Sequence, residues 1–253
     1  MIATGGHPWT PDISGVKEHA ITSNEALKLP KLPKNISILG SGYIAIEFAF
    51  IFRGFGSNVN LIYRSDLPLR GFDNEIRGCL EKELLNKEIK IYPKTKIKNV
   101  SKNSKLDIEL DDGRILSSDE LLVATGRKAN TDNLKLENIG VEISHDRSIL
   151  VNENSRTNIE TVFAIGDVID GPMLAHKAEE EGIAVAELIA GQSGHVNYDI
   201  IPGVVYTSPE VAYVGKSEEQ LKKENIGYKI GKFPFMANSR AKAIDEPEGF
   251  VKI

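Results

Sequence analysis

The sequence has little of what marks several large classes of protein. Cys79 is the single cysteine, so the chain cannot form an internal disulfide, a CxxC redox pair or a zinc site built of cysteines. The longest apolar run, residues 43–52, is interrupted by Glu47 and is far shorter than the ~20 residues of a membrane-spanning helix. The five histidines show no metal-ligand spacing, and we expect neither a metal site nor a membrane segment.

Blocks of charge of one sign are also absent. Lys and Arg number 31 and Asp and Glu 36, giving a net charge of −5 without a charged tract, which argues against nucleic acid as the main partner. Residues 1–6 carry no basic stretch and no long apolar one, so we expect no signal peptide and a cytoplasmic location. Hydrophobic residues make up 41% and charged residues 26%, the composition of a folded globular protein of one or two domains.

What is present is a βαβ pattern. Residues 35–39 form a short, branched apolar run that predicts a buried parallel strand, and residues 43–53 predict an apolar helix after a glycine-rich turn. Residues 59–63 predict the next strand. Further along we expect a helix at 74–86, a strand at 89–92, an antiparallel meander over 95–116 and a buried strand at 120–124.

Beyond residue 126 the pattern becomes less regular. We expect a strand at 161–165, a helix from about 175 to 190, strands at 204–206 and 211–214, a helix at 217–224, and strands near 229–235 and 250–253. Strands and helices therefore alternate along most of the chain, which indicates an α/β fold.

The turn after the first strand carries the main chemical signal. Residues 40–45 read Gly-Ser-Gly-Tyr-Ile-Ala, the G-x-G-x-x-A pattern, directly after a strand and at the start of a helix. In such a turn Gly40 permits the tight bend, Gly42 lets the backbone approach a pyrophosphate, and the small Ala45 lets helix and strand pack closely. The helix N-terminus offers unpaired N–H groups to the anion. A glycine turn that serves packing alone is the alternative.

Residues after the second strand bear on which dinucleotide binds. An acidic residue at this strand tip would accept hydrogen bonds from a ribose 2′-hydroxyl, whereas arginine would pair with a 2′-phosphate. The segment carries Arg64 and Arg70, with Asp66 the only nearby acid. Guanidinium groups bind phosphate through charge-assisted hydrogen bonds, so we expect NADPH rather than NADH. Two solvated surface arginines are the alternative.

Three motifs in order resemble those of the flavin-dependent pyridine nucleotide–disulfide oxidoreductases: GSGYIAIE at 40–47, ATGR at 124–127 and VFAIGD at 162–167. The resemblance covers essentially the whole chain. It implies an α/β fold with a Rossmann-like NAD(P) domain inserted in the remnant of an FAD domain, followed by a truncated α+β dimer-interface domain. The implied domains are 1–32 (end of the first half of the FAD domain), 33–126 (NAD(P)-binding), 127–198 (second half of the FAD domain) and 199–253 (start of the dimerisation domain).

Subfamily features differ along the chain. Up to about residue 164 the sequence resembles glutathione reductase, with Arg64 and Arg70 at the NADPH positions, and from about residue 166 it resembles dihydrolipoamide dehydrogenase. The resemblance implies an FAD-dependent enzyme of glutathione-disulfide reductase type that uses NADPH. A dihydrolipoamide dehydrogenase that uses NADH and a non-catalytic dinucleotide-binding fragment are the alternatives. The implied substrate is a small disulfide, oxidised glutathione or lipoamide, and the implied full-length relative is a homodimer.

The resemblance also implies roles for single residues. Tyr43 would cover the flavin face and act as a gate that moves aside for the nicotinamide, and Glu47 would hold the carboxamide end of the nicotinamide. Asp167 would accept hydrogen bonds from the flavin ribityl chain; a turn aspartate is the alternative. The implied NADPH-binding set is Gly40, Ser41, Gly42, Tyr43, Ile44, Glu47, Arg64, Arg70, Ile97 and Gly126, and the implied FAD-binding set is Asp167, Met173, Leu174, Ala175 and His176.

The family's catalytic parts are expected to lie outside this sequence. Its charge-transfer cysteine pair belongs to the first FAD helix and its His–Glu pair to the end of the interface domain, and neither pair is found here. The chain therefore resembles an internal fragment, for which we expect no catalytic residue, no disulfide reductase turnover and weak or absent flavin retention. Cys79 is expected to be a buried structural thiol, and the flanks of the nucleotide domain are expected to expose apolar surface.

Overall fold

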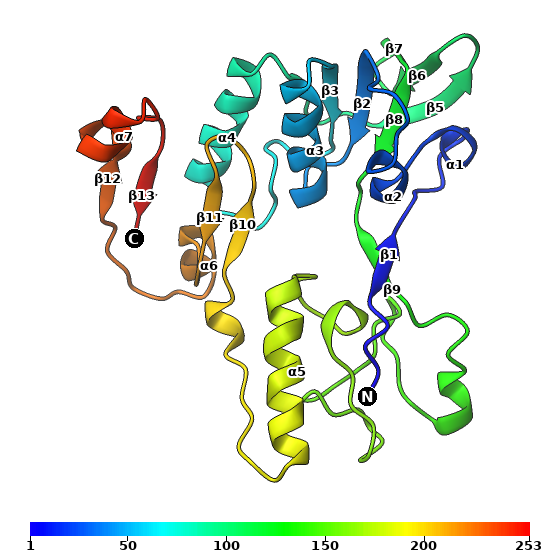
Figure 1. Ribbon diagram of the computed structural model, residues 1–253, viewed down its shortest axis with the longest axis vertical. Coiled ribbons are helices and arrows are strands. Elements are labelled where there is room, and N and C mark those ends of the chain that lie inside the picture. Colours follow the sequence, from blue (N-terminus) through cyan, green and yellow to red (C-terminus); the bar gives the residue numbers. More distant parts are fainter. The chain divides into compact units, whose positions relative to one another are not determined.

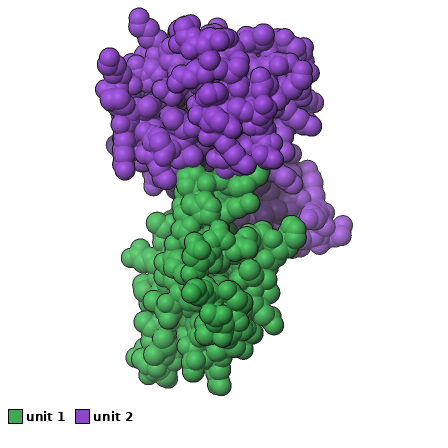
Figure 2. Space-filling model, turned by 90° about the vertical axis from the view of Figure 1, so that its right-hand side faces the viewer, with its two compact units in different colours: residues 1–9, 126–201 green, residues 10–125, 202–253 purple.

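The computed structural model describes residues 1–253, and the chain divides into two compact units (Figure 2). Unit 1 comprises residues 1–9 and 126–201, and unit 2 comprises residues 10–125 and 202–253. The chain therefore leaves unit 1 after nine residues, builds the first part of unit 2, and returns. This order agrees with the predicted insertion of one domain into another.

A four-stranded parallel sheet forms the centre of unit 2, in the order β4–β3–β2–β8. Its strands are β2 (Asn35–Leu39), β3 (Asn58–Ile62), β4 (Lys90–Tyr92) and β8 (Glu120–Val123). Helix α3 (Tyr43–Gly54) joins β2 to β3, and helix α4 (Asn74–Asn86) joins β3 to β4. These elements confirm the predicted βαβ unit, in which a helical crossover returns the chain to a parallel strand.

Both faces of this sheet are covered. Figure 1 shows α3 and α4 on one side and the antiparallel sheet β5–β6–β7 on the other. Ile38 and Leu61 pack on the helix side, whereas the next residues along their strands, Leu39 and Ile62, pack with the antiparallel sheet. Because successive side chains point to opposite faces and both faces are covered, β2 and β3 need apolar side chains on both sides. The antiparallel strands are β5 (Ile97–Lys102), β6 (Leu106–Leu110) and β7 (Ile115–Ser118).

The segment before β2 packs with unit 2. It contains the one-turn helices α1 (Val16–His19) and α2 (Ser23–Ala26). Val16 is fully buried beside residues of the antiparallel sheet, and Ile21 forms a parallel bridge to Leu122 of β8. The division between the two units therefore falls after residue 9. The assignment of residues 1–32 to an FAD domain stays a prediction.

Residues 202–253 add two hairpins and two short helices to unit 2. Strands β10 (Gly203–Val205) and β11 (Val211–Tyr213) pair antiparallel, as do β12 (Lys232–Pro234) and β13 (Phe250–Lys252). The helices are α6 (Glu218–Lys223) and α7 (Ser239–Ala243), and a 3-10 turn, η4 (Phe235–Ala237), precedes α7. Several large apolar side chains here are exposed, as the sequence predicts: Val214, Phe233, Met236, Ile244 and Ile253.

Unit 1 has little regular structure apart from one long helix. Strand β1 (Gly6–Pro8) pairs antiparallel with β9 (Arg127–Ala129), and α5 (Ala175–Ile189) matches the predicted helix. Three 3-10 turns complete it: η1 (Leu136–Ile139), η2 (Gly166–Val168) and η3 (Tyr198–Ile200). Across the whole chain, none of the helices has the length and apolar character required to cross a bilayer.

The predicted strand at 161–165 is wrong. Phe163, Ala164 and Ile165 are buried, but they form only two isolated bridges, Ala164 with Ile2 and Phe163 with Arg156. An apolar run predicts burial, whereas a strand also needs a continuous ladder of backbone partners. The two bridges supply such a partner at single positions only.

Candidate functional site

The carboxyl ends of β2, β3 and β8 meet at one edge of the parallel sheet. Leu39 lies opposite both Ile62 and Val123. The Gly40 N–H donates to the Ile62 carbonyl at 2.9 Å, and the Ala124 N–H donates to the Leu39 carbonyl at 2.8 Å. The chain leaves β2 towards β3 on one side, while β8 flanks β2 on the other. In α/β sheets such a switch in strand order is where ligands bind.

The two glycines of the turn have different environments. Gly40 has a φ of +138°, and a β-carbon there would lie 2.2 Å from the Ala124 carbonyl oxygen and 3.3 Å from the Ala45 side chain. Gly42 is exposed, and a β-carbon there would meet nothing within 4 Å. Gly40 therefore lets two loops approach, and Gly42 leaves the backbone open.

The N-terminus of α3 begins directly at this open backbone. Gly42 is the N-cap residue, and no side chain caps the first turn. The first N–H groups of a helix lack partners inside the helix and carry partial positive charge. Residues 40–44 therefore fit a pyrophosphate on the basis of their own geometry.

The loop after β3 presents two arginines without partners. Arg64 and Arg70 are exposed and form no hydrogen bond or ion pair. Asp66, the nearby acid, is paired with Lys94 at 3.0 Å between Oδ1 and Nζ. The Leu69 N–H donates to the Ser41 carbonyl at 2.8 Å, which holds this loop against the glycine turn. The two guanidinium charges thus lie on a loop attached to the turn, without a carboxylate to neutralise them.

Arg77 of α4 shapes the same loop, a role the sequence analysis missed. Its guanidinium donates to the carbonyls of Pro68 at 2.6 Å and Leu67 at 2.8 Å. Asp73 caps the start of α4 by accepting from the Glu75 N–H at 3.0 Å. An arginine in the first turn of a helix gives no sequence signal for this role, because the carbonyls it binds become neighbours only when the loop folds back.

Tyr43 and Glu47 lie one helical turn apart on α3, and both contact residues 202–253 of the same unit. The Tyr43 ring packs edge-to-face on Phe72, with centroids 5.5 Å apart. Burial, followed by a hydrogen bond shared with Tyr213, raises the pKa of the Tyr43 phenol well above its usual value. Glu47 is half-buried, and its Oε1 accepts the Tyr206 N–H at 3.0 Å. The Glu47 carboxylate is therefore held in place by the backbone at Tyr206.

Three other residues of the predicted NADPH set occupy different environments. Ile44 is half-buried and packs against the helix-side core. Ile97 begins β5 with its side chain buried in the core between the two sheets, so only its backbone remains for a ligand. In unit 1, Gly126 has a φ of +136° and open space at its β-carbon position.

The predicted flavin residues lie in unit 1. Asp167 is a half-buried residue of η2, and its Oδ2 is 3.7 Å from the Arg127 Nε. At the start of α5, Met173 and Leu174 are half-buried and Ala175 and His176 are exposed, with no side chain capping the first turn. A carboxylate acceptor and an uncapped helix start fit the hydroxyls and carbonyls of a flavin.

A buried ion pair on α5 supports the turn that carries Asp167. Lys177 Nζ lies 2.9 Å from Glu181 Oε1, and both side chains are almost fully buried. The other carboxylate oxygen of Glu181 accepts the Gly166 N–H at 2.7 Å, and the Tyr198 hydroxyl donates to Glu181 at 3.0 Å. Lysine and glutamate four residues apart usually indicate an exposed helix face, so no local pattern predicts this pair inside the unit.

Neither a buried thiol nor a metal site is found. Cys79 is half-buried on α4, so the prediction of a buried thiol is wrong; position 79 lies at the margin of the helix face whose core residues are Leu80 and Leu84. No group of three or more histidine, cysteine, aspartate or glutamate side chains is placed to hold a metal ion.

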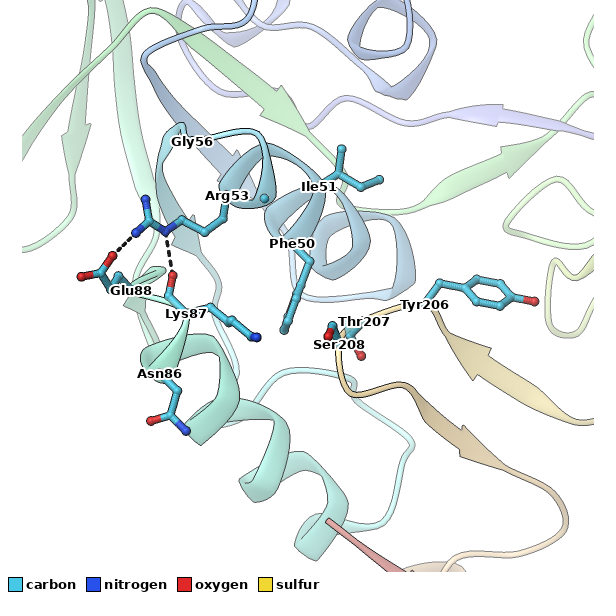
Figure 3. A pocket seen from close by; sticks show the side chains of 11 residues that line it. Phe50, Ile51, Arg53, Gly56, Asn86, Lys87, Glu88, Tyr206, Thr207 and Ser208 are labelled. Carbon is cyan, nitrogen blue, oxygen red and sulfur yellow. Dashed lines mark hydrogen bonds and ion pairs between the residues drawn. The ribbon is translucent and has the colours of Figure 1, made fainter. Parts of the chain in front are cut away.

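Unit 2 also has a cavity of about 740 Å³ at the C-terminal end of α3 (Figure 3). Phe50 projects from α3 towards Thr207 and Ser208, and the Arg53 Nε donates to the Lys87 carbonyl at 2.7 Å. Arg53 also pairs with Glu88. The glycine turn, at the other end of α3, contributes no residue to this cavity.

The fold and the turn define the class of protein. A glycine turn at the carboxyl edge of a parallel sheet, leading into an uncapped helix, is the arrangement found in dinucleotide-binding α/β proteins. Residues 1–182 match the family described as pyridine nucleotide-disulphide oxidoreductase, and residues 201–253 match the dimerisation domain of that family. The chain belongs to the pyridine nucleotide-disulphide oxidoreductase family.

Curated relatives resemble the chain over its full length. Dihydrolipoyl dehydrogenase 1, mitochondrial, of Arabidopsis thaliana is 47% identical over 260 residues, which cover 100% of this chain and 51% of the relative. A leghemoglobin reductase of Vigna unguiculata is 47% identical over 261 residues, covering 100% of this chain and 50% of the relative. The chain thus spans about half the length of these relatives.

Solved structures agree with the fold. The HOCl-induced flavoprotein disulfide reductase RclA of Escherichia coli superimposes with a TM-score of 0.91 at 26% identity, covering 98% of this chain and 58% of that chain. LpdA of Mycobacterium tuberculosis gives a TM-score of 0.90 at 25% identity, covering 99% of this chain and 55% of that chain. The comparisons confirm the predicted family and fold class, while the glutathione reductase type stays a prediction.

Proposed function

We propose that this chain carries the dinucleotide site of an FAD-dependent NAD(P)H:disulfide oxidoreductase and that NADPH is its reductant. The observation that carries the proposal is the open backbone at Gly42, directly before the uncapped start of α3. A pyrophosphate at this turn would accept hydrogen bonds from the first amides of the helix and interact favourably with the helix dipole.

The choice of NADPH rests on the loop that docks on the turn. With the pyrophosphate at α3, the adenosine half of the ligand extends towards the end of β3, where Arg64 and Arg70 lie. Both guanidinium groups are exposed and unpaired, so a 2′-phosphate would replace water rather than break an existing ion pair. NADH lacks the 2′-phosphate that these guanidinium groups would bind.

The nicotinamide half would reach Tyr43 and Glu47. Glu47 already binds the Tyr206 amide through Oε1, which orients the carboxylate and leaves Oε2 as an acceptor for the carboxamide N–H. Tyr43 follows Gly42 directly and is half-buried. It would move aside to admit the nicotinamide ring.

Unit 1 would contribute to the flavin site. Asp167 would accept hydrogen bonds from ribityl hydroxyls, and residues 173–176 would offer main-chain groups at the start of α5. When bound, the flavin supplies the hydride acceptor between the nicotinamide and a disulfide. Glu181 and Lys177 would hold the Gly166–Asp167 turn in place from inside the unit.

Two disulfide substrates follow from different observations. The pair of free arginines favours an NADPH-dependent reductase of the glutathione-disulfide type. The 47% identity to a dihydrolipoyl dehydrogenase over the whole chain favours lipoamide with NADH as the second candidate. In either case we propose that the complete protein is a homodimer assembled through the segment that begins at residue 201.

Calorimetric titration of the chain with NADPH and NADH tests the proposal. We expect NADPH to bind at least about tenfold more tightly, since one additional charge-assisted contact is worth about 1.5–3 kcal/mol. Arg64→Glu should remove this preference and leave NADH binding unchanged. Arg240→Glu, an exposed arginine on α7, gives the same change of charge and should alter neither affinity. Folded protein that releases heat with neither nucleotide would contradict the proposal.

A further inference from the structure

The β10–β11 hairpin contacts both residues proposed to meet the nicotinamide. Tyr206, just after β10, binds Glu47 through its backbone N–H at 3.0 Å. Tyr213, the last residue of β11, packs with Phe72, and Phe72 packs with Tyr43. Two residues one turn apart on α3 are therefore held by one hairpin from the far end of the sequence.

The three aromatic rings form an edge-to-face series. The Tyr43 and Phe72 centroids are 5.5 Å apart with the planes at 61°, and the Phe72 and Tyr213 centroids are 4.6 Å apart at 71°. These are favoured geometries for aromatic pairs. Phe72 therefore links the Tyr213 ring to the Tyr43 ring.

Gly203 shows how closely the two tyrosines approach. A β-carbon on Gly203 would lie 2.6 Å from the Tyr43 hydroxyl oxygen and 2.2 Å from Cε1 of the Tyr213 ring. Gly203 itself is buried. The two phenol rings therefore occupy the space that any side chain at position 203 would need, and the position of Tyr43 is determined by the hairpin as well as by its own helix.

We propose that Tyr213 is a positioning residue that holds Tyr43 in its ligand-free position and thereby lowers the affinity for the nicotinamide half of the dinucleotide. This inference rests on the proposed function, in which Tyr43 moves to admit the nicotinamide. Contacts made only in the ligand-free position must be broken on binding, so they weaken the apparent affinity. The Glu47 contact with Tyr206 keeps the hairpin beside α3 while Tyr43 moves.

The proposal predicts that ligands with and without nicotinamide respond differently. NADPH requires Tyr43 to move, whereas 2′-phospho-ADP-ribose has the same adenosine half and pyrophosphate but no nicotinamide. Tyr213→Leu removes the ring contact with Phe72. We expect this variant to bind NADPH about two- to tenfold more tightly, the range that the loss of one aromatic pair gives, with 2′-phospho-ADP-ribose unchanged.

The experiment is calorimetric titration of the full chain and its variants with both ligands, together with thermal melting. Tyr228→Leu removes another tyrosine of the same C-terminal segment, whose hydroxyl is bonded to Glu218, and it should change neither affinity. Phe72→Leu removes the middle ring of the series and should also tighten NADPH binding selectively. In Tyr43→Leu protein, Tyr213→Leu should have no further effect, because the ring that Tyr213 positions is absent.

The outcomes of these titrations distinguish failure of the positioning role from failure of the proposed function. Normal wild-type binding with an unchanged NADPH affinity in Tyr213→Leu overturns the positioning role of Tyr213 and leaves the proposed function standing. Equal changes in the affinity for both ligands, with a lower melting temperature, would mean that Tyr213 acts on the fold alone. This result would also overturn the positioning role of Tyr213. A folded wild-type chain that binds neither ligand overturns the proposed function and this inference with it.

Discussion

The carbonyl oxygen of Ala124 occupies the place that a side chain on Gly40 would need, 2.2 Å from an ideal β-carbon position. Gly40 follows β2 and Ala124 follows β8, so the contact joins the loops at the ends of two neighbouring parallel strands. Its consequence is that Gly40 supports the shape of the site, whereas Gly42, two residues on, is open to a ligand.

Alanine at the two glycines should therefore separate stability from binding. Gly40→Ala should destabilise unit 2 by about 1–3 kcal/mol through its positive φ alone, with the clash against Ala124 adding to that. Gly42→Ala should leave the unfolding midpoint nearly unchanged but weaken NADPH and NADH alike by about tenfold, since a methyl group would then stand where the pyrophosphate approaches. Urea unfolding and calorimetry measure the two effects. Tight dinucleotide binding by Gly42→Ala would argue against this turn as the site.

Salt should affect the two nucleotides unequally. Arg64 and Arg70 are exposed, so their attraction for a 2′-phosphate is screened as the Debye length falls from about 10 Å at 0.1 M salt to about 3 Å at 1 M. We expect NADPH affinity to fall several-fold more than NADH affinity over this range, as followed by quenching of intrinsic fluorescence. An Arg64→Ala, Arg70→Ala double variant should show the NADH slope with both ligands.

The buried Lys177–Glu181 pair should be far more sensitive to substitution than an exposed pair of the same spacing. Lys177→Met would leave a buried carboxylate without its cation and should cost about 3–5 kcal/mol of unfolding free energy. Lys222 is exposed, and Lys222→Met, which breaks its pair with Glu218, should cost much less. Chemical denaturation compares the two. The double variant Lys177→Met, Glu181→Gln should recover part of the loss, and a single variant as stable as the wild type would contradict the burial.

Acid should destabilise unit 2 through the carboxylates around Lys252. Lys252 Nζ lies 2.8 Å from Asp73 and 2.7 Å from Glu218. Hydrogen bonds from Lys222 and then Lys252 lower the pKa of Glu218 to about 2, from a usual value of 4.5. A carboxylate whose folded-state pKa is lowered contributes stability above its unfolded-state pKa, and that stability is lost as pH falls.

The expected window for this loss is from about pH 4.5 down to about pH 2. The urea midpoint, measured between pH 6 and pH 2, should fall in that window. Lys252→Met should make the fall shallower, because part of what lowers the pKa of Glu218 is removed. Lys229→Met, at an exposed lysine without an ion pair, should leave the pH profile of the wild type unchanged. A Lys252→Met profile identical to the wild type would show that the cluster does not form in solution.

Local pattern was enough to predict the central βαβ unit. In residues 35–39, Ile36 and Ile38 are buried on one face and Leu39 on the other, and the turn at 40–42 needs glycine for reasons that hold wherever such a turn occurs. The same reasoning placed a strand at 161–165, where burial is present but the backbone partners of a strand are not. An apolar run predicts that the residues are buried. Whether they form a strand depends on an adjacent segment that supplies a continuous series of backbone hydrogen bonds.

The amino-acid sequence by itself determined the family, the order of the main elements and the place of the glycine turn, because each of these depends on residues close together in the chain. The tertiary structure alone decided that Arg64 and Arg70 are unpaired, that Arg77 holds their loop and that Lys177 and Glu181 face inward. It also decided that Tyr213 packs on Phe72, which packs on Tyr43. The physical reason is that a contact between distant segments depends on how the chain folds back on itself, and a local pattern of residues does not contain that information.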